Sequence, residues 1–140
     1  MARYQSTKNT FIMTFLWGIV IALITIIVVA VRSGENNILS ILFVLTTISL
    51  IIWILLDTRY VIKNNNLKYR SGPFRGKIDV LNIKKNEHYS GTNPPVTMKP
   101  ALDNKGIILF YNLTDSIFVS PVSAEKFLIE LKEINSNIEF

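Results

Sequence analysis

Cysteine is absent from this 140-residue chain, and histidine occurs only once, as His88. The absence of cysteine excludes a disulfide framework, a thiolate metal site and a cysteine nucleophile. Metal sites need several histidine, cysteine or carboxylate ligands at defined spacing, and the scattered acidic residues do not provide such a set. We therefore expect no metal and no cofactor, and we expect His88 to be an ordinary surface residue in a polar, loop-like stretch.

Charged residues are absent from two long apolar runs, residues 10–31 and 38–56. A helix rises about 1.5 Å per residue, so roughly 20 apolar residues cross a hydrocarbon core about 30 Å thick. Both runs reach this length, and the polar residues 32–37 between them are only enough to reverse the chain. The pattern predicts a hairpin of two transmembrane helices.

Other interpretations of these runs fit less well. Core helices of a soluble protein would show a polar stripe at the helical period, and these runs show none. A cleaved signal peptide has an apolar region of typically about 7–15 residues, shorter than the first run. The runs lack the intramembrane charges of an ion pathway, and no glycine-rich phosphate loop or dinucleotide motif occurs. We expect neither an enzyme nor a transporter that acts alone.

Basic residues flank the two runs unevenly, which predicts their orientation. The first nine residues contain Arg3 and Lys8, and the intervening segment contains only Arg32. Four basic residues closely follow the second run, namely Arg59, Lys63, Lys68 and Arg70. We predict a multi-pass protein of the cell membrane with residues 1–9 as a cytoplasmic tail, residues 32–37 as an external loop and both termini in the cytoplasm.

Small residues recur on one face of the first predicted helix, where close helix packing in lipid needs them. They are Thr14, Gly18, Ala22 and Thr25, and the second run offers Ser40 and Thr47 on a shared face. We expect these residues to pack the two helices against each other. The alternatives are a dimerisation seam and a contact with the other subunits of a small transport complex.

The remainder, residues 57–140, has the patterns of a soluble domain. Asn64–Asn66 is a turn signal between two short strands, and a third strand at residues 77–84 changes register near Val80. Residues 86–106 are predicted to form a long loop, followed by strands at 107–111 and 116–119. An amphipathic helix then buries Phe127, Leu131 and Ile134, with Ser120 or Ser123 as its N-cap. We predict an antiparallel β-rich unit with a C-terminal helix.

A family resemblance rests on several of these segments. They are Tyr60-x-Ile62, Leu67, Arg70-Ser-Gly-Pro-Phe-Arg75, the isoleucine-rich strand at 78–83, Phe118-Val-Ser-Pro121 and Phe127-x-x-x-Leu131. Together they resemble the bacterial pleckstrin-homology-like (PH-like) domains of small membrane proteins, a group that includes the sublancin immunity protein. The resemblance implies a curled barrel or sandwich capped by the C-terminal helix, anchored in the membrane. It also implies a role in bacteriocin self-immunity, with the peptide or its membrane target as partner, and supplies no catalytic residues.

A concentration of positive charge is the main chemical feature of the predicted domain. Its members are Lys63, Lys68, Arg70, Arg75, Lys77, Lys84 and Lys85. Held beneath an anionic leaflet, each contributes on the order of 1 kcal/mol of attraction. We interpret this strip as a site for anionic lipid headgroups or for an acidic partner; topology and a solvated sheet face would explain it equally. Nucleic acid is not an expected partner because aromatic residues are sparse among the basic ones.

Overall fold

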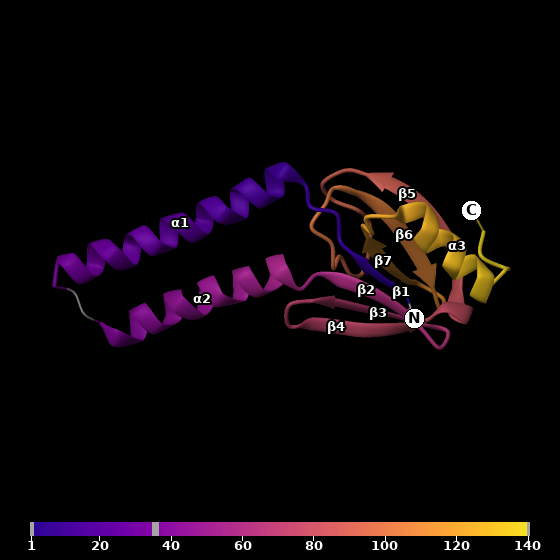
Figure 1. Ribbon diagram of the computed structural model, residues 1–140, viewed down its shortest axis with the longest axis horizontal. Coiled ribbons are helices and arrows are strands. Elements are labelled where there is room, and N and C mark those ends of the chain that lie inside the picture. Colours follow the sequence, from indigo (N-terminus) through magenta and orange to yellow (C-terminus); the bar gives the residue numbers. More distant parts are fainter. Residues whose placement is uncertain (1, 35–36, 140) are drawn as a thin grey trace.

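The computed structural model describes residues 2–34 and 37–139. Two apolar helices form a hairpin at one end, and two antiparallel sheets with a C-terminal helix form a domain at the other (Figure 1). The predicted fold class is therefore confirmed. The strands that follow the hairpin extend away from its end, so the domain lies beyond the end of the hairpin rather than beside it.

The hairpin consists of α1 (Thr10–Arg32) and α2 (Ile38–Leu56). Each helix begins at an asparagine cap: the side-chain oxygen of Asn9 accepts from the Phe11 amide at 2.9 Å, and that of Asn37 accepts from the Leu39 amide at 3.1 Å. Both helices are long and apolar enough to cross a bilayer by length and composition. Of the predicted loop 32–37, Arg32 ends α1, Ser33 and Gly34 begin the turn, and residues 35 and 36 lie outside the described residues.

The contact between the two helices differs from the one that the small residues predicted. Thr14, Gly18, Ala22, Thr25 and Ser40 are exposed, Thr47 is half-buried, and an added Cβ at Gly18 would meet nothing within 4 Å. The buried residues of the hairpin are instead Val20, Ile48 and Leu55. The residues predicted to pack the helices therefore lie mostly on the exposed side of the hairpin.

The N-terminal segment is part of the domain, which corrects the prediction of a tail. Strand β1 (Ala2–Gln5) pairs antiparallel with β2 (Arg59–Lys63), with Tyr4 opposite Tyr60. Beyond β1, the Thr7 amide donates to the Ser120 carbonyl at 2.6 Å and the Asn9 amide donates to the Leu102 carbonyl at 3.0 Å. The pairing partner lies more than 50 residues away, so local sequence could not reveal this strand. The hairpin is thus inserted between two neighbouring strands of one sheet.

The first sheet has the strand order β1-β2-β3-β4, with β3 spanning Asn66–Ser71 and β4 spanning Phe74–Asp79. The predicted turn is confirmed: Asn64 and Asn65 both have positive φ angles, 49° and 59°, as tight hairpin turns require. The expected third strand at 77–84 is instead two strands. A 3-10 turn at Val80–Asn82 separates them and carries the chain from the first sheet into the second, which is the physical basis of the irregularity near Val80.

The second sheet has the order β5-β6-β7, formed by Ile83–Ser90, Lys105–Tyr111 and Asp115–Val119. His88 therefore lies on strand β5 and not in a loop, and the loop predicted at residues 86–106 is limited to residues 91–104. Helix α3 (Ala124–Ile134) buries Phe127 and Leu131 as predicted, and Leu128 with them, whereas Ile134 is half-buried. Ser123 is at the N-cap position but its side chain makes no capping hydrogen bond. These side chains join the inward residues of both sheets in one core.

A tight contact joins the hairpin to the domain. The turn between β3 and β4 reaches α2, and a Cβ added at Gly72 would lie 2.7 Å from Ile54 Cγ1. Beside it, the Thr58 hydroxyl lies 3.0 Å from the Ser71 hydroxyl and donates to the Ile54 carbonyl at 2.7 Å. Glycine is needed at 72 for its φ of +56° as well as for the close approach. This is the structural role of the Ser-Gly-Pro turn.

Candidate functional site

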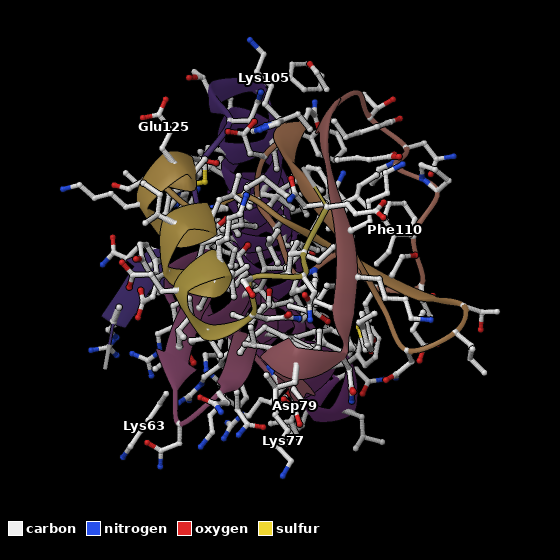
Figure 2. All side chains as sticks on the ribbon, turned by 90° about the vertical axis from the view of Figure 1, so that its right-hand side faces the viewer. Lys63, Lys77, Asp79, Lys105, Phe110 and Glu125 are labelled. Atoms are coloured by element: carbon white, nitrogen blue, oxygen red, sulfur yellow. The ribbon has the colours of Figure 1, made fainter. Side chains whose placement is uncertain are left out.

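The outward side of the first sheet carries most of the predicted basic strip. We call it the basic face; its members are Arg3, Arg59, Lys63, Lys68, Arg70, Arg75 and Lys77. The strand register places Arg59, Arg70 and Arg75 in one row across β2, β3 and β4. A second row contains Arg3, Lys68 and Lys77, and Lys63 begins a third. Figure 2 shows Lys63 and Lys77 on the same side of the domain.

These rows lie at increasing distance from the end of α2. Successive outward residues of a strand are about 7 Å apart, and the arginine row is the one nearest the turn that contacts α2. The potential of an anionic leaflet falls off within a Debye length of about 8–10 Å. The arginine row is therefore the best placed for a membrane surface, and the lysine-rich rows are better placed for a ligand beside the domain.

A hollow of about 450 Å³ lies within the basic face. Six basic side chains line it, namely Arg3, Arg59, Lys63, Lys68, Arg70 and Arg75. Its floor is low because Val61, which lies between Arg3 and Lys68 in the second row, has a short side chain. Gly76 lies on the inward side of β4, where the Tyr69 hydroxyl occupies the space that a Cβ would need. The result is a concave surface rimmed by positive charge, which is suited to an anionic group.

Asp57 neutralises part of the arginine row and ties it to α2. Its carboxylate forms ion pairs with Arg59, at 3.3 Å from Nη2, and with Nε of Arg70. The Trp53 indole N–H donates to the same carboxylate at 3.3 Å, and the Arg75 guanidinium lies 5.8 Å from the centre of the Trp53 ring. The position of the row relative to the hairpin is thereby fixed.

The other members of the basic face are not neutralised in this way. In the part of the chain that the structure describes, no ion pair involves Arg3, Lys63, Lys68 or Lys77. Across the strands Lys68 lies directly opposite Lys77, a like-charge pairing that is unfavourable unless an anion lies between them. The uncompensated charge is thus concentrated on the second row, because the third row contains Asp79 as well as Lys63.

Two residues of the predicted strip lie elsewhere. Lys84 and Lys85 are on β5 of the second sheet, beyond the corner at Val80–Asn82. Lys85 Nζ lies 2.6 Å from Glu87 Oε1, and this hydrogen bond and charge raise the pKa of Lys85. The corner separates residues that are close in sequence, so the strip of seven breaks into five members of the basic face and two others.

The structure adds Arg3 and Arg59 to the site, which sequence reasoning used only for membrane orientation. Arg59 alternates with Val61 and Lys63, so extension of the predicted strand by one residue could have placed it on the outer face. Arg3 carried a weaker signal, because the alternation in Ala2–Gln5 is only four residues long. Its assignment needs the pairing of β1 with β2.

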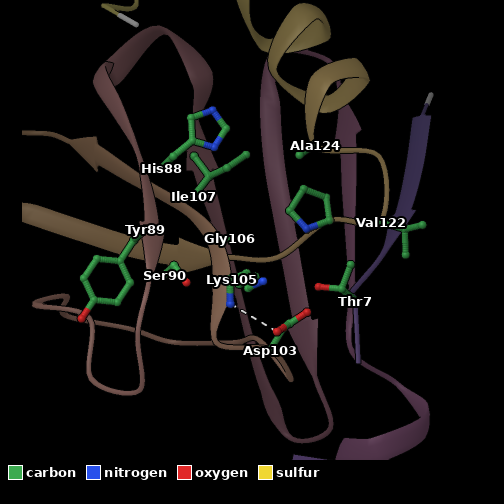
Figure 3. A pocket seen from close by; sticks show the side chains of 11 residues that line it. Thr7, His88, Tyr89, Ser90, Asp103, Lys105, Gly106, Ile107, Val122 and Ala124 are labelled. Carbon is green, nitrogen blue, oxygen red and sulfur yellow. Dashed lines mark hydrogen bonds between the residues drawn. The ribbon is translucent and has the colours of Figure 1, made fainter. Parts of the chain in front are cut away.

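A larger hollow of about 670 Å³ lies on the other side of the domain and contains His88 (Figure 3). Asp103 in its wall is held by the backbone: its Oδ1 accepts from the Asn104 amide at 2.6 Å and from the Lys105 amide at 3.2 Å. Burial opposes ionisation, but hydrogen bonds from Thr7, Asn9 and these amides outweigh it and lower the pKa of Asp103. This carboxylate closes a turn, and we assign the hollow no chemistry.

Comparison with known families identifies the domain. A family model described as bacterial PH domain matches residues 58–135. The match begins at Thr58, so it leaves out β1 and the hairpin, although β1 completes the first sheet. Comparisons with curated proteins and with solved structures gave no match.

Proposed function

The chain belongs to the bacterial PH domain family, and from this premise we propose that it is a membrane-anchored binding protein without enzymatic activity. The hairpin would be the anchor and the basic face would be the binding surface. The fold alone does not specify a ligand, so the proposal depends on the geometry of this face. Its main support is the hollow lined by six basic side chains, most of whose charge is uncompensated.

Two features support insertion of the hairpin in the membrane with both termini in the cytoplasm. Most apolar side chains of α1 and α2 face outward, as expected for helices surrounded by lipid. Because β1 precedes the hairpin and pairs with β2 after it, both flanks must lie on the same side of any bilayer that the hairpin crosses. The basic residues on these flanks favour the cytoplasmic side.

The ligand that we propose for the basic face is an acidic segment of a peptide or a membrane-protein partner. The first sheet extends away from the end of α2 (Figure 1), so the arginine row is the row of the basic face nearest to the level of the lipid headgroups. Lys68 and Lys77 would face sideways above the bilayer, where a neighbouring membrane protein or a surface-bound peptide would present its own acidic residues. Complementary charge of this kind gives specificity and fast association.

Binding can be tested on the full chain in nanodiscs of phosphatidylcholine, with a fluorescent ten-residue peptide that carries five glutamates. Lys68→Glu with Lys77→Glu should weaken binding about tenfold or more at low salt. A matched control is Lys84→Glu with Lys126→Glu, two exposed lysines outside the face that give the same change in net charge. An equal loss in both pairs would assign binding to net charge alone. Loss of peptide binding when part of the phosphatidylcholine is replaced by anionic lipid would assign the face to the membrane surface.

The biological role that we propose is self-immunity toward a bacteriocin, by interception of the peptide or by shielding of its membrane target. The resemblance of the turn Arg70-Ser-Gly-Pro-Phe-Arg75 and its flanking strands to immunity-type PH-like domains motivates this role. Deletion of the gene, followed by challenge with the host's own culture supernatant, tests it. Sensitivity that is restored to resistance by the intact gene, but not by the Lys68→Glu, Lys77→Glu variant, is the expected result. Unchanged sensitivity after deletion would exclude the immunity role.

A further inference from the structure

Two further hollows lie where the hairpin joins the domain. The first, which we call the base hollow, has a volume of about 300 Å³ and contains Arg3, Lys8 and Arg59 together with Leu56. The second, which we call the helix groove, has a volume of about 520 Å³ and runs along α1 from Lys8 to Ile21. Lys8 lines both, so the two hollows meet at its side chain.

The base hollow is positively charged. Arg3 and Lys8 are exposed and form no ion pair within the described residues, while Arg59 shares Asp57 with Arg70. Three cations thus surround a space whose other walls are neutral, including the buried side chains of Ser6 and Thr58. A group with one negative charge is complementary to this hollow.

The helix groove is apolar and has the length of one leaflet. One wall is the row Met13, Trp17 and Ile21, at steps of four residues, and the floor includes Gly18, which has no neighbour within 4 Å of an added Cβ. From Thr10 to Ile21 the helix rises about 16 Å, close to half of a hydrocarbon core about 30 Å thick. The groove therefore begins at the predicted membrane surface and ends near the predicted midplane.

We propose that these hollows together bind one anionic glycerophospholipid of the cytoplasmic leaflet, with its phosphate among Arg3, Lys8 and Arg59 and one acyl chain along the helix groove. This inference rests on the proposed membrane insertion of the hairpin but not on the acidic partner of the basic face. The lipid is favoured over other occupants because a positively charged hollow is continuous with an apolar groove, which matches an anionic headgroup followed by an acyl chain. A second helix would cover the apolar groove but would place no anionic group beside Lys8. Free phosphate would leave the groove unfilled.

Trp17 provides a direct reporter of the acyl chain. The full chain with Trp53→Phe, in neutral detergent micelles, is titrated with phosphatidylglycerol that carries bromine atoms on its acyl chains. We expect saturable quenching of Trp17 fluorescence at about one lipid per protein. Brominated phosphatidylcholine should quench only at concentrations about fivefold or more higher, because a net-neutral headgroup is less complementary to the three cations.

Two substitutions test the two halves of the site, and both positions are exposed, so neither disturbs the core. Lys8→Gln should weaken the phosphatidylglycerol titration about fivefold, whereas Lys84→Gln on the second sheet should not. Gly18→Leu fills the groove and should abolish saturable quenching, while Ala22→Leu, on the same exposed face but outside the groove, should preserve it. Glycerol phosphate in excess should not displace the lipid.

The results also separate this inference from the proposed function. Equal quenching by both brominated lipids, or quenching that survives Gly18→Leu, would overturn the lipid site. Displacement by glycerol phosphate would assign the base hollow to a soluble anion, and a stable dimer whose Trp17 resists quenching would assign the groove to a second copy. Lys68→Glu with Lys77→Glu should leave the lipid titration unchanged, and Lys8→Gln should leave binding of the acidic peptide unchanged.

Discussion

Gly72 lies against Ile54, so that a Cβ on this glycine would come within 2.7 Å of the isoleucine side chain and within 3.3 Å of its backbone. This contact places the turn between β3 and β4 on the last turns of α2. It fixes the direction of the basic face relative to the hairpin, because the arginine row follows immediately on both strands. The orientation of the candidate site thus depends on a glycine that carries no chemistry of its own.

Gly72→Ala should therefore loosen the junction. The substitution strains a backbone with φ of +56° and also forces a methyl group into Ile54, and overpacking of this kind typically costs about 1–3 kcal/mol. We expect a lower Tm in detergent micelles and faster proteolysis near residue 57. Gly34→Ala is the matched control, because Gly34 also has a positive φ, +78°, but has open space around it. Equal effects of the two variants would show that backbone strain, and not the contact, is responsible.

The domain should fold without its hairpin only if β1 is retained. A chain in which residues 2–9 are joined to residues 57–139 by a flexible linker should be monomeric and should unfold cooperatively, because Ser6 and Thr58 are already hydrogen-bonded neighbours. Residues 57–139 alone expose the edge of β2 and should self-associate. Analytical ultracentrifugation of both proteins distinguishes these outcomes. A monomeric, cooperative fragment 57–139 would show that β1 is dispensable.

Tyr4 should make stability depend on pH in the alkaline range. Burial, together with a hydrogen bond of 2.6 Å to Glu130 and the charge of that residue, raises the pKa of Tyr4 from 10.0 to about 12. Because the folded state holds this proton more tightly, its contribution to stability is complete below pH 10 and is lost as the pH rises to about 12.

We expect Tyr4→Phe to cost about 1 kcal/mol at pH 7. The difference in stability between this variant and the native protein should then shrink between pH 10 and 12, in urea unfolding of the full chain. Glu130→Gln keeps a hydrogen-bond acceptor but removes the charge, so it should move this loss to lower pH. A difference between Tyr4→Phe and native protein that stays constant up to pH 12 would contradict the assignment.

Asp57→Asn should destabilise the protein and strengthen its affinity for anions. The substitution removes the charge that Arg59 and Arg70 share, and the Nε atom of Arg70 is buried at this carboxylate. Both partners are about one-third exposed, so we expect a loss of about 1–2 kcal/mol. A double-mutant cycle with Arg70→Met, measured by thermal unfolding, isolates the pair. At the same time, the acidic peptide should bind more tightly, and weaker binding would argue against the arginine row as part of the site.

Local pattern was sufficient for most elements of the chain. The absence of charge marked both helices, the asparagine turn marked the hairpin of β2 and β3, and the spacing of Phe127 and Leu131 marked α3. It failed where a contact joins distant residues. Strand β1 pairs across the whole hairpin, and the corner at Val80–Asn82 sends Lys84 and Lys85 to a different sheet from the lysines that precede them.

The sequence by itself determined that two uncharged helices precede a basic, β-rich domain, because length, apolarity and strand alternation are properties of neighbouring residues. Only the tertiary structure decided which positive charges act together. Arg3 joins Lys68 because β1 and β3 flank the same strand, and Lys8 meets both the base hollow and the helix groove because the chain enters the hairpin there. These juxtapositions arise from pairing between segments that are far apart in the chain, and no local periodicity encodes them.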